Sequence, residues 1–364
     1  MRTESYMGLV RAALWGKPAH WPVEQTEELL ILNARQGTGT LVYPAVLAQE
    51  DLFSYARVQM KSACAHTMQQ QVHIHHIFGQ AWQALENAGI LAVLMKGAGL
   101  AALYAEPQLR TWGDIDLFVG KEQYHPACAV MRETFPDALK FDEELDHYKH
   151  YNLIAEGVSI EVHRVSIGLQ HPLDERRYAR IEEYGMQHAQ TIELDGISVR
   201  VPEPTFNALF VFMHAWEHKL SLGANVRQLC DLALVLHHYH STIDVERLTK
   251  WLRALHMTDV WQLYMGILVE HLGVPHDEAP LYTERVALRV RLLLEDILKG
   301  GRLVERADNE ASKNRFVRKF HTMQERLQEA RLVRRYSPEY ARHLTATVLV
   351  HGLQRLFAKD RHWE

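Results

Sequence analysis

The sequence predicts an α+β protein in which a small mixed β-sheet is embedded in a mainly helical chain. Three observations lead to this prediction. Short apolar or alternating runs, which are typical of strands, gather between residues 90 and 202. Four of these runs form two pairs around Gly-containing turns, as in β-hairpins. From Pro204 onward the apolar residues follow a helical period almost throughout.

A helical region is expected before the strands. Residues 52 to 88 contain no proline and end at Asn87-Ala88-Gly89, a sequence that commonly stops a helix. We therefore divide the chain into an N-terminal helical region at 1–88, an α/β core at 89–203 and a C-terminal helical domain at 204–364. The C-terminal helices are expected at 204–219, 225–240, 244–256, 258–272, 283–299, 310–335 and 338–357.

The core begins with "ILAVLM" at 90–95, a short apolar run that suits a buried strand. Lys96-Gly97 turns the chain into a short helix, "LAALYA" at 100–105, and "DIDLFV" at 114–119 is the next strand. A helix is expected at 122–134. Two hairpins follow, at 147–165 around Gly157 and at 191–202, where Asp195-Gly196 is the favoured tip of a two-residue turn.

Composition narrows the class of protein. The chain has 364 residues, of which 47% are hydrophobic and 23% charged, as in ordinary globular proteins. Its net charge of −5 gives no general argument for nucleic-acid or membrane binding. Three scattered cysteines fit a reducing compartment. No apolar run approaches the roughly 18 residues that span a bilayer, so we expect a cytoplasmic protein without a membrane partner.

Carboxylates are placed on one face of two predicted strands. Asp114 and Asp116 point the same way, about 6.5 Å apart along the strand, because side chains alternate. Glu161 and His163 repeat this arrangement on a later strand. If the two strands are neighbours, three carboxylates meet. The residues expected to face the core are Ile115, Leu117, Ile160 and Val162.

Such a group of acids suits hard divalent cations. Two Mg²⁺ ions roughly 3.5–4 Å apart can hold a phosphoryl group during its transfer. Lys96-Gly97 forms a strand-to-helix turn whose backbone N–H groups can meet a phosphate. Arg110, in the loop before the acidic strand, can supply a cation for a triphosphate. D-x-D alone is more often a solvated strand face; the whole order of elements is the stronger signal.

The order KG…R-x-x-G-D-I-D-L-F-V…IEVH resembles the nucleotidyltransferases of the DNA polymerase β superfamily. More narrowly, it resembles their uncharacterised bacterial branch, which has a "KG…R…DIDLLV…ELH" pattern. The resemblance covers roughly residues 60 to 240. It includes "EPTFNALFVFMHAWEHK" and "VRQLCDLALVL", which match the helical half of that branch.

The resemblance implies transfer of a nucleotide from an NTP to an acceptor hydroxyl or phosphate, with Mg²⁺, or alternatively Mn²⁺, as cofactor. By position, Asp114 and Asp116 match the metal-binding pair and Glu161 the third, catalytic carboxylate. Lys96-Gly97 stands where the superfamily usually has Gly-Ser or Gly-Gly. The chain therefore lacks a serine hydroxyl that commonly touches the triphosphate.

Further basic groups are candidates for nucleotide binding. His163 would donate to a phosphate or carry a proton; the alternative is a histidine bonded to Glu161. Lys219 or Arg227 would reach a triphosphate from the helical part, although Arg227 and Asp231 share a helix face and also suit a structural ion pair.

Two other groups of basic residues favour a structural interpretation. The histidine-rich "HIHH" and "HHYH" lack a zinc motif and indicate solvated helix faces. The basic segment 302–335 is interleaved with glutamates, which favours a surface helix over an RNA-binding one.

Two other functions stay open at this stage. The first is a degenerate nucleotidyltransferase that binds a nucleotide or a partner without turnover, and the second is a metal-dependent phosphohydrolase with water as acceptor. The acceptor is not identified by the sequence; a small molecule, a sugar or a protein is favoured over RNA. We expect Asp114→Asn and Asp116→Asn each to stop turnover without loss of stability, because like charges in one site repel.

Overall fold

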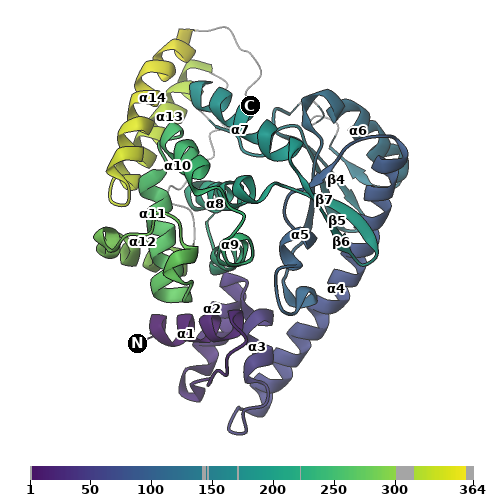
Figure 1. Cartoon of the computed structure of the whole chain (residues 1–364), viewed down its shortest axis with the longest axis vertical. Coiled ribbons are helices and arrows are strands. Elements are labelled where there is room, and N and C mark those ends of the chain that lie inside the picture. The colour runs from purple at the N-terminus through teal and green to yellow at the C-terminus, as the bar shows by residue number, and fades with distance from the viewer. Residues whose placement is uncertain are drawn as a thin grey trace. The chain divides into compact units, whose positions relative to one another are not determined.

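The structure is a computed structural model that describes residues 2–141, 145, 147–169, 172–221, 223–300 and 315–357 (Figure 1). It confirms the α+β class, since a mixed five-stranded sheet lies in a mainly helical chain. Its contacts define two compact units. The first comprises Met1–Gly168 and Ile181–Asn207, and the second comprises Leu169–Arg180 and the chain from Ala208 onward. The predicted three-region division stays a prediction.

Helices precede the sheet in the first unit. They are α1 (Arg2–Leu14), α2 (Thr26–Gln36), α3 (Gly39–Val46) and α4 (Ser54–Asn87). The long helix expected at 52–88 is thus confirmed as α4. Gly89 caps its C-terminal end, since a φ of 69° lets the N–H of Ile90 reach the carbonyl of Leu85 at 2.9 Å.

The main sheet has the order β1-β2-β5-β4-β3. Strands β2 and β5 are parallel and the other neighbours are antiparallel. The strands are β1 (Val93–Leu94), β2 (Asp114–Phe118), β3 (Leu139–Lys140), β4 (His150–Ala155) and β5 (Val158–His163). The strand expected at 90–95 is therefore shorter than predicted, because the cap of α4 uses Ile90 and only two residues pair with β2.

The predicted hairpins are confirmed. Strands β4 and β5 turn at Glu156-Gly157, and the separate pair β6 (Gln190–Leu194) and β7 (Ile197–Val201) turns at Asp195-Gly196. Both turns have two residues with positive φ, 50° and 83° in the first and 49° and 79° in the second. Positive φ at both central residues is what a tight hairpin turn requires.

The apolar core of the first unit joins the sheet to two helices, α4 and α6 (Gly120–Thr134). The residues that alternate with the carboxylates point into it and are fully buried, as predicted. They are Ile115, Leu117, Ile160 and Val162. This packing fixes which face of β2 and β5 carries the acids.

Helix α5 (Ala98–Ala101) starts earlier and ends sooner than the helix expected at 100–105. After it, the N–H groups of Leu103 and Tyr104 bond three residues back, to Leu100 and Ala101, so the chain tightens instead of continuing an α-helix. Glu106 precedes Pro107, and a residue before proline disfavours the α conformation.

Helix α7 (Pro172–Gln187) was not predicted. Its signals were a proline at the first position and the acids Asp174 and Glu175 in the first turn, both typical of helix starts. The boundary between the two units falls inside it.

The described residues from Pro204 onward are mainly helical, as predicted. Its helices are α8 (Pro204–Ser221), α9 (Val226–Tyr239), α10 (Val245–Ala254), α11 (Thr258–Ile267), α12 (Ala287–Lys299), α13 (Arg315–Val333) and α14 (Pro338–Phe357). The first part of the basic segment, 302–314, lies outside the described residues. Within the described ranges, no helix combines the length and apolar character needed to cross a bilayer.

Candidate active site

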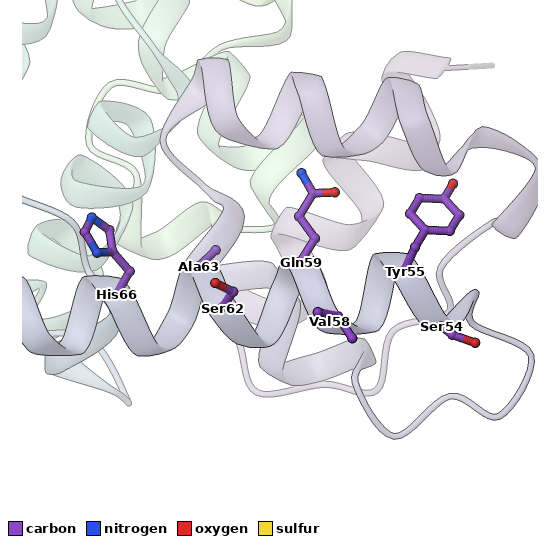
Figure 2. Close-up of a pocket in the computed structure, with 7 residues that line it drawn as sticks. All are labelled: Ser54, Tyr55, Val58, Gln59, Ser62, Ala63 and His66. Carbon is purple, nitrogen blue, oxygen red and sulfur yellow. The ribbon is translucent and has the colours of Figure 1, made fainter.

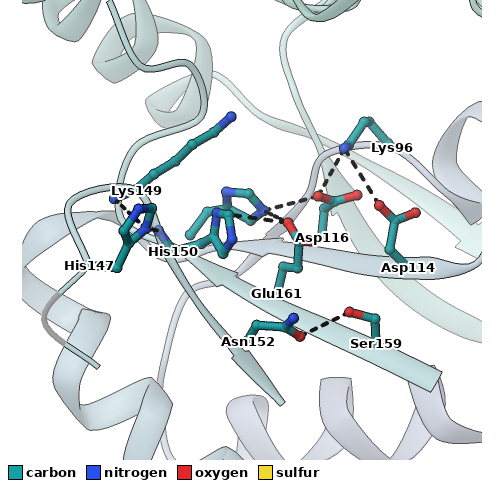
Figure 3. Close-up of polar contacts among 10 residues, drawn as sticks. Lys96, Asp114, Asp116, His147, Lys149, His150, Asn152, Ser159 and Glu161 are labelled. Atoms are coloured by element: carbon teal, nitrogen blue, oxygen red, sulfur yellow. Dashed lines mark hydrogen bonds and ion pairs between the residues drawn. The ribbon is translucent and has the colours of Figure 1, made fainter. Parts of the chain in front are cut away.

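The parallel pairing of β2 and β5 brings the predicted acids together. Asp116 lies opposite Glu161, and Asp114 lies opposite Ser159 one pleat away (Figure 3). The two aspartates differ in exposure: the side chain of Asp114 is 45% exposed and that of Asp116 is 0% exposed. The predicted meeting of three carboxylates thus follows from one strand register. We call the group formed by Lys96, Asp114, Asp116, Glu161 and His163 the strand cluster.

His163 joins two of these acids. Its Nε2 donates to Oδ1 of Asp116 at 3.0 Å and lies 3.1 Å from Oε2 of Glu161. Burial alone would lower the pKa of His163, but the bonds and charges of the two acids outweigh it and raise that pKa. Burial likewise opposes ionisation of Glu161, yet the bond from His163 leaves its pKa lowered. The two carboxylates therefore favour the protonated form of the imidazole.

Lys96 supplies a second cation. Its Nζ lies 3.0 Å from Oδ1 of Asp116 and 4.0 Å from Oδ2 of Asp114 (Figure 3). Burial disfavours both charges, but their mutual attraction raises the pKa of Lys96 and lowers that of Asp116. Lys96 and His163 both approach the same oxygen of Asp116.

The other oxygen of Asp116, Oδ2, is buried without a hydrogen-bond partner among the described residues. Leaving a buried charged acceptor unsatisfied is costly. A divalent cation would satisfy it, and Asp114 and Glu161 offer further oxygens of the kind that Mg²⁺ prefers. These carboxylate oxygens therefore fit a hard cation, provided that the ammonium of Lys96 moves away from them.

The turn after β1 is held rigidly beside these acids. Gly97 has φ +54°, and a Cβ there would lie 2.8 Å from the ring of Trp112. Nη1 of Arg110 donates to the carbonyl of Gly97 at 3.2 Å, and Arg110 is buried. The structure thus brings Lys96, Gly97 and Arg110 together at one turn, with only a glycine fitting at its centre.

His150 is a member of the site that the sequence reasoning missed. It pairs with His163 across β4 and β5, with ring centroids 5.0 Å apart, and its Nδ1 lies 3.9 Å from Oε2 of Glu161. Burial lowers its pKa to about 4. The Gly157 turn, once recognised, fixes the register and would have placed His150 opposite His163.

Glu182 is a second missed acid. It lies on α7 and its Oε1 accepts from the N–H and the hydroxyl of Ser166, at 2.6 and 2.5 Å. Burial raises the pKa of Glu182. Ser166 follows β5 by three residues, so this carboxyl fixes the chain that leaves the strand cluster. Because α7 was not predicted, no sequence signal connected Glu182 to the site.

Lys219 and Arg227 belong to the second compact unit, on α8 and α9. Nζ of Lys219 donates to the carbonyl of Asp296 at 3.2 Å, and burial lowers the pKa of Lys219. Their contact with a nucleotide stays a prediction. The neighbouring His214 and His218 do share a helix face, with ring centroids 4.3 Å apart.

A surface pocket elsewhere in the first unit is lined by α4 alone (Figure 2). None of its side chains is a carboxylate, so it does not offer the acidic oxygen ligands that the strand cluster offers to a hard cation. The reacting groups are therefore sought in the strand cluster and not in this pocket. The lining residues are Ser54, Tyr55, Val58, Gln59, Ser62, Ala63 and His66.

Two comparisons with known proteins find a similarity. The model of a family described as uncharacterised nucleotidyltransferase matches residues 22–273. No curated protein matches the chain. A solved structure, an antigenic nucleotidyltransferase-like protein from Paracoccidioides brasiliensis, is similar at 16% identity and a TM-score of 0.31, covering 53% of this chain and 88% of that one.

Proposed function

This chain belongs to the family of uncharacterised nucleotidyltransferases, and on that premise we propose that it transfers a nucleoside monophosphate from an NTP to an acceptor with the help of divalent cations. The observation that carries the proposal is the strand cluster. Three carboxylates share one face of two parallel strands, and one buried oxygen of Asp116 has no partner among the described residues.

The reaction that we propose is a displacement at the α-phosphorus. The acceptor oxygen bonds to that phosphorus, the bond to the β-phosphate oxygen breaks, and pyrophosphate leaves. The acceptor proton passes to a base, for which Glu161 is the candidate. Asp114, Asp116 and Glu161 would hold two Mg²⁺ or Mn²⁺ ions, and these would neutralise charge on the triphosphate.

Basic residues would bind the nucleotide. Lys96 now neutralises the acids; with cations between the carboxylates, its ammonium would be available to a phosphate. Nδ1 of His163 is buried and has no hydrogen-bond partner within the described part of the chain, so it would suit a phosphate oxygen. Arg110 is proposed as a further contact to the triphosphate, and its bond to the Gly97 carbonyl would keep that turn in place.

One observation favours a second candidate function. Lys96 and His163 already neutralise Asp116 without any metal. A chain of this kind would suit a nucleotide-binding protein without turnover. The two candidates differ in whether a cation displaces Lys96 from the acids.

Incubation of the full chain with each α-labelled NTP and Mg²⁺ tests the proposal. We expect pyrophosphate release and label transfer to an acceptor, supplied as sugars, small alcohols, proteins or RNA ends. Asp114→Asn should abolish both, while Glu193→Gln, an exposed acid on β6, should change neither. Binding without any product would support the second candidate, and release of inorganic phosphate alone would indicate a phosphohydrolase.

The proposed setting is the cytoplasm, where NTPs and Mg²⁺ are present together. The acceptor class that we favour is a small molecule, a sugar or a protein. RNA is not favoured, because the basic segment 302–335 is interleaved with glutamates, as in a surface helix.

A further inference from the structure

Three side chains with metal-binding chemistry converge in the second compact unit. Asp174 lies in the first turn of α7, His256 follows α10, and His343 lies on α14. One potential ligand atom from each lies within 4.8 Å of the other two. Nε2 of His343 is 2.5 Å from Oδ2 of Asp174, and the two imidazole rings have centroids 4.1 Å apart. We call these three residues the helix cluster.

His256 occupies a backbone position that favours glycine. The N–H of His256 bonds to the carbonyl of Arg253 at 3.2 Å, and that of Met257 bonds to Leu252 at 2.8 Å, the two bonds of a Schellman cap. The φ of His256 is 59°, a left-handed value that costs a residue with a Cβ free energy. The chain therefore holds an imidazole beside His343 where a glycine would cap the helix better.

Asp174 is oriented by a neighbouring arginine. Nη1 of Arg177 donates to Oδ1 of Asp174 and to the carbonyl of Ala254, both at 3.0 Å. Arg177 thus links the carboxylate to the end of α10, two residues before His256. The other oxygen, Oδ2, faces His343. Such an outer partner, holding one carboxylate oxygen and leaving the second for a ligand role, is usual around metal sites.

A hydrogen-bonded pair alone would not need the third residue. Asp174 and His343 already satisfy each other, yet the His256 ring lies stacked on His343. Two imidazoles and one carboxylate form a ligand set common to zinc sites, with a fourth position left for water.

We propose that Asp174, His256 and His343 bind one divalent cation of the zinc class. Ligand atoms at about 2.0–2.2 Å from zinc stand roughly 3.3 Å apart. The 2.5 Å contact would open slightly and the longer separations would close around the ion. The cation would join α7, α14 and the α10–α11 connection. This site is separate from the strand cluster, and its existence does not depend on the proposed transferase activity.

The test counts zinc bound to the full chain. All samples carry Glu161→Gln, so that the His150, Glu161 and His163 group, which also has ligand spacing, is weakened as a competing site. After EDTA treatment and dialysis, we expect His256→Gly and His343→Gln each to lose one equivalent of Zn²⁺. The affinity for Zn²⁺ should fall by at least about 100-fold, since loss of a residue that only orients a metal ligand already costs about 10–100-fold in metal affinity. A Co²⁺ titration should show a tetrahedral visible band that both variants lose.

Two controls separate ligation from folding and from surface binding. His256→Gly suits the left-handed cap, so without metal its melting temperature should equal or exceed that of the parent, while Zn²⁺ should no longer raise it. His238→Ala, an exposed histidine of the same unit, should bind zinc as the parent does. Unchanged zinc stoichiometry and an unchanged zinc-induced melting shift in both His256→Gly and His343→Gln would overturn the proposal.

Discussion

The strand cluster and the helix cluster both pair carboxylates with histidines, but the sequence specifies them in different ways. In the strand cluster, one parallel register sets Asp116 opposite Glu161, and alternation fixes which face they share. In the helix cluster, three segments separated by about eighty residues each must pack before any two side chains meet. A site on neighbouring strands can therefore be predicted from the residue pattern of the two strands, whereas a site between helices depends on how the helices pack.

The two clusters also differ in how their charges are held. Asp116 is fully buried between Lys96 and His163. Asp174 is partly neutralised by Arg177, whose side chain is 45% exposed. Because water screens the pair of Asp174 and Arg177, removal of the Asp116 charge should lower the free energy of unfolding more than removal of the Asp174 charge.

The largest effect is expected from Asp116→Asn. It takes the nearest counter-charge from buried Lys96 and leaves only the more distant Asp114, so the free energy of unfolding should fall by about 3–5 kcal/mol. Asp174→Asn should cost about 1–3 kcal/mol, as for a lost charged hydrogen bond. Urea denaturation in EDTA measures both. This revises the sequence-based expectation that Asp116→Asn leaves stability unchanged, and a smaller loss for Asp116→Asn than for Asp174→Asn would contradict the difference.

Gly97→Ala should come next. The new methyl group meets the Trp112 ring, and the φ of +54° is unfavourable for alanine. We expect a loss of about 1–3 kcal/mol in unfolding free energy and weaker nucleotide binding in calorimetry. Gly113→Ala is the matched control, because its Cβ would meet nothing within 4 Å, and it should stay within about 0.5 kcal/mol. Equal effects of the two substitutions would show that the Gly97 turn is not constrained.

His163 and His150 should make the free energy of unfolding depend on pH in opposite directions. His163 has a raised pKa, so its contribution is present below about pH 6.5 and is lost as pH rises through its folded pKa. His150 has a pKa of about 4, so stability falls as pH drops from about 6.5 towards 4. Stability in EDTA should therefore peak near pH 6.5. His163→Gln should flatten the alkaline side only; an unchanged alkaline side would refute the paired imidazole.

The smallest effect on stability is expected from Asp114→Asn. Asp114 is 45% exposed and its Oδ2 lies 4.0 Å from Nζ of Lys96, so the unfolding free energy should change by less than about 1 kcal/mol. Turnover should nevertheless be lost, because the carboxylate is a proposed cation ligand. Retained pyrophosphate release with the natural NTP would remove Asp114 from the site.

The sequence by itself determined most of the elements and the face of the strand cluster. Because side chains alternate along a strand, Asp114 and Asp116 point to one face of the sheet and Ile115 and Leu117 to the other. The turn residues fixed both hairpins. Both are local properties of the backbone. Helix α7 was not predicted, although the acids in its first turn are typical of a helix start. Asp174 and Glu182, which lie on this helix, were therefore not identified as site residues.

Only the tertiary structure decided which charges meet. That Lys96 neutralises Asp116, that Arg110 supports the Gly97 carbonyl, and that His256 stacks on His343 all depend on contacts between segments distant in the chain. Helical periodicity tells which face of a helix is buried, but not what it is buried against. A single strand register, by contrast, aligns every residue along two strands at once. For this reason the meeting of the acids with His163 could be anticipated, while their ion pair with Lys96 could not.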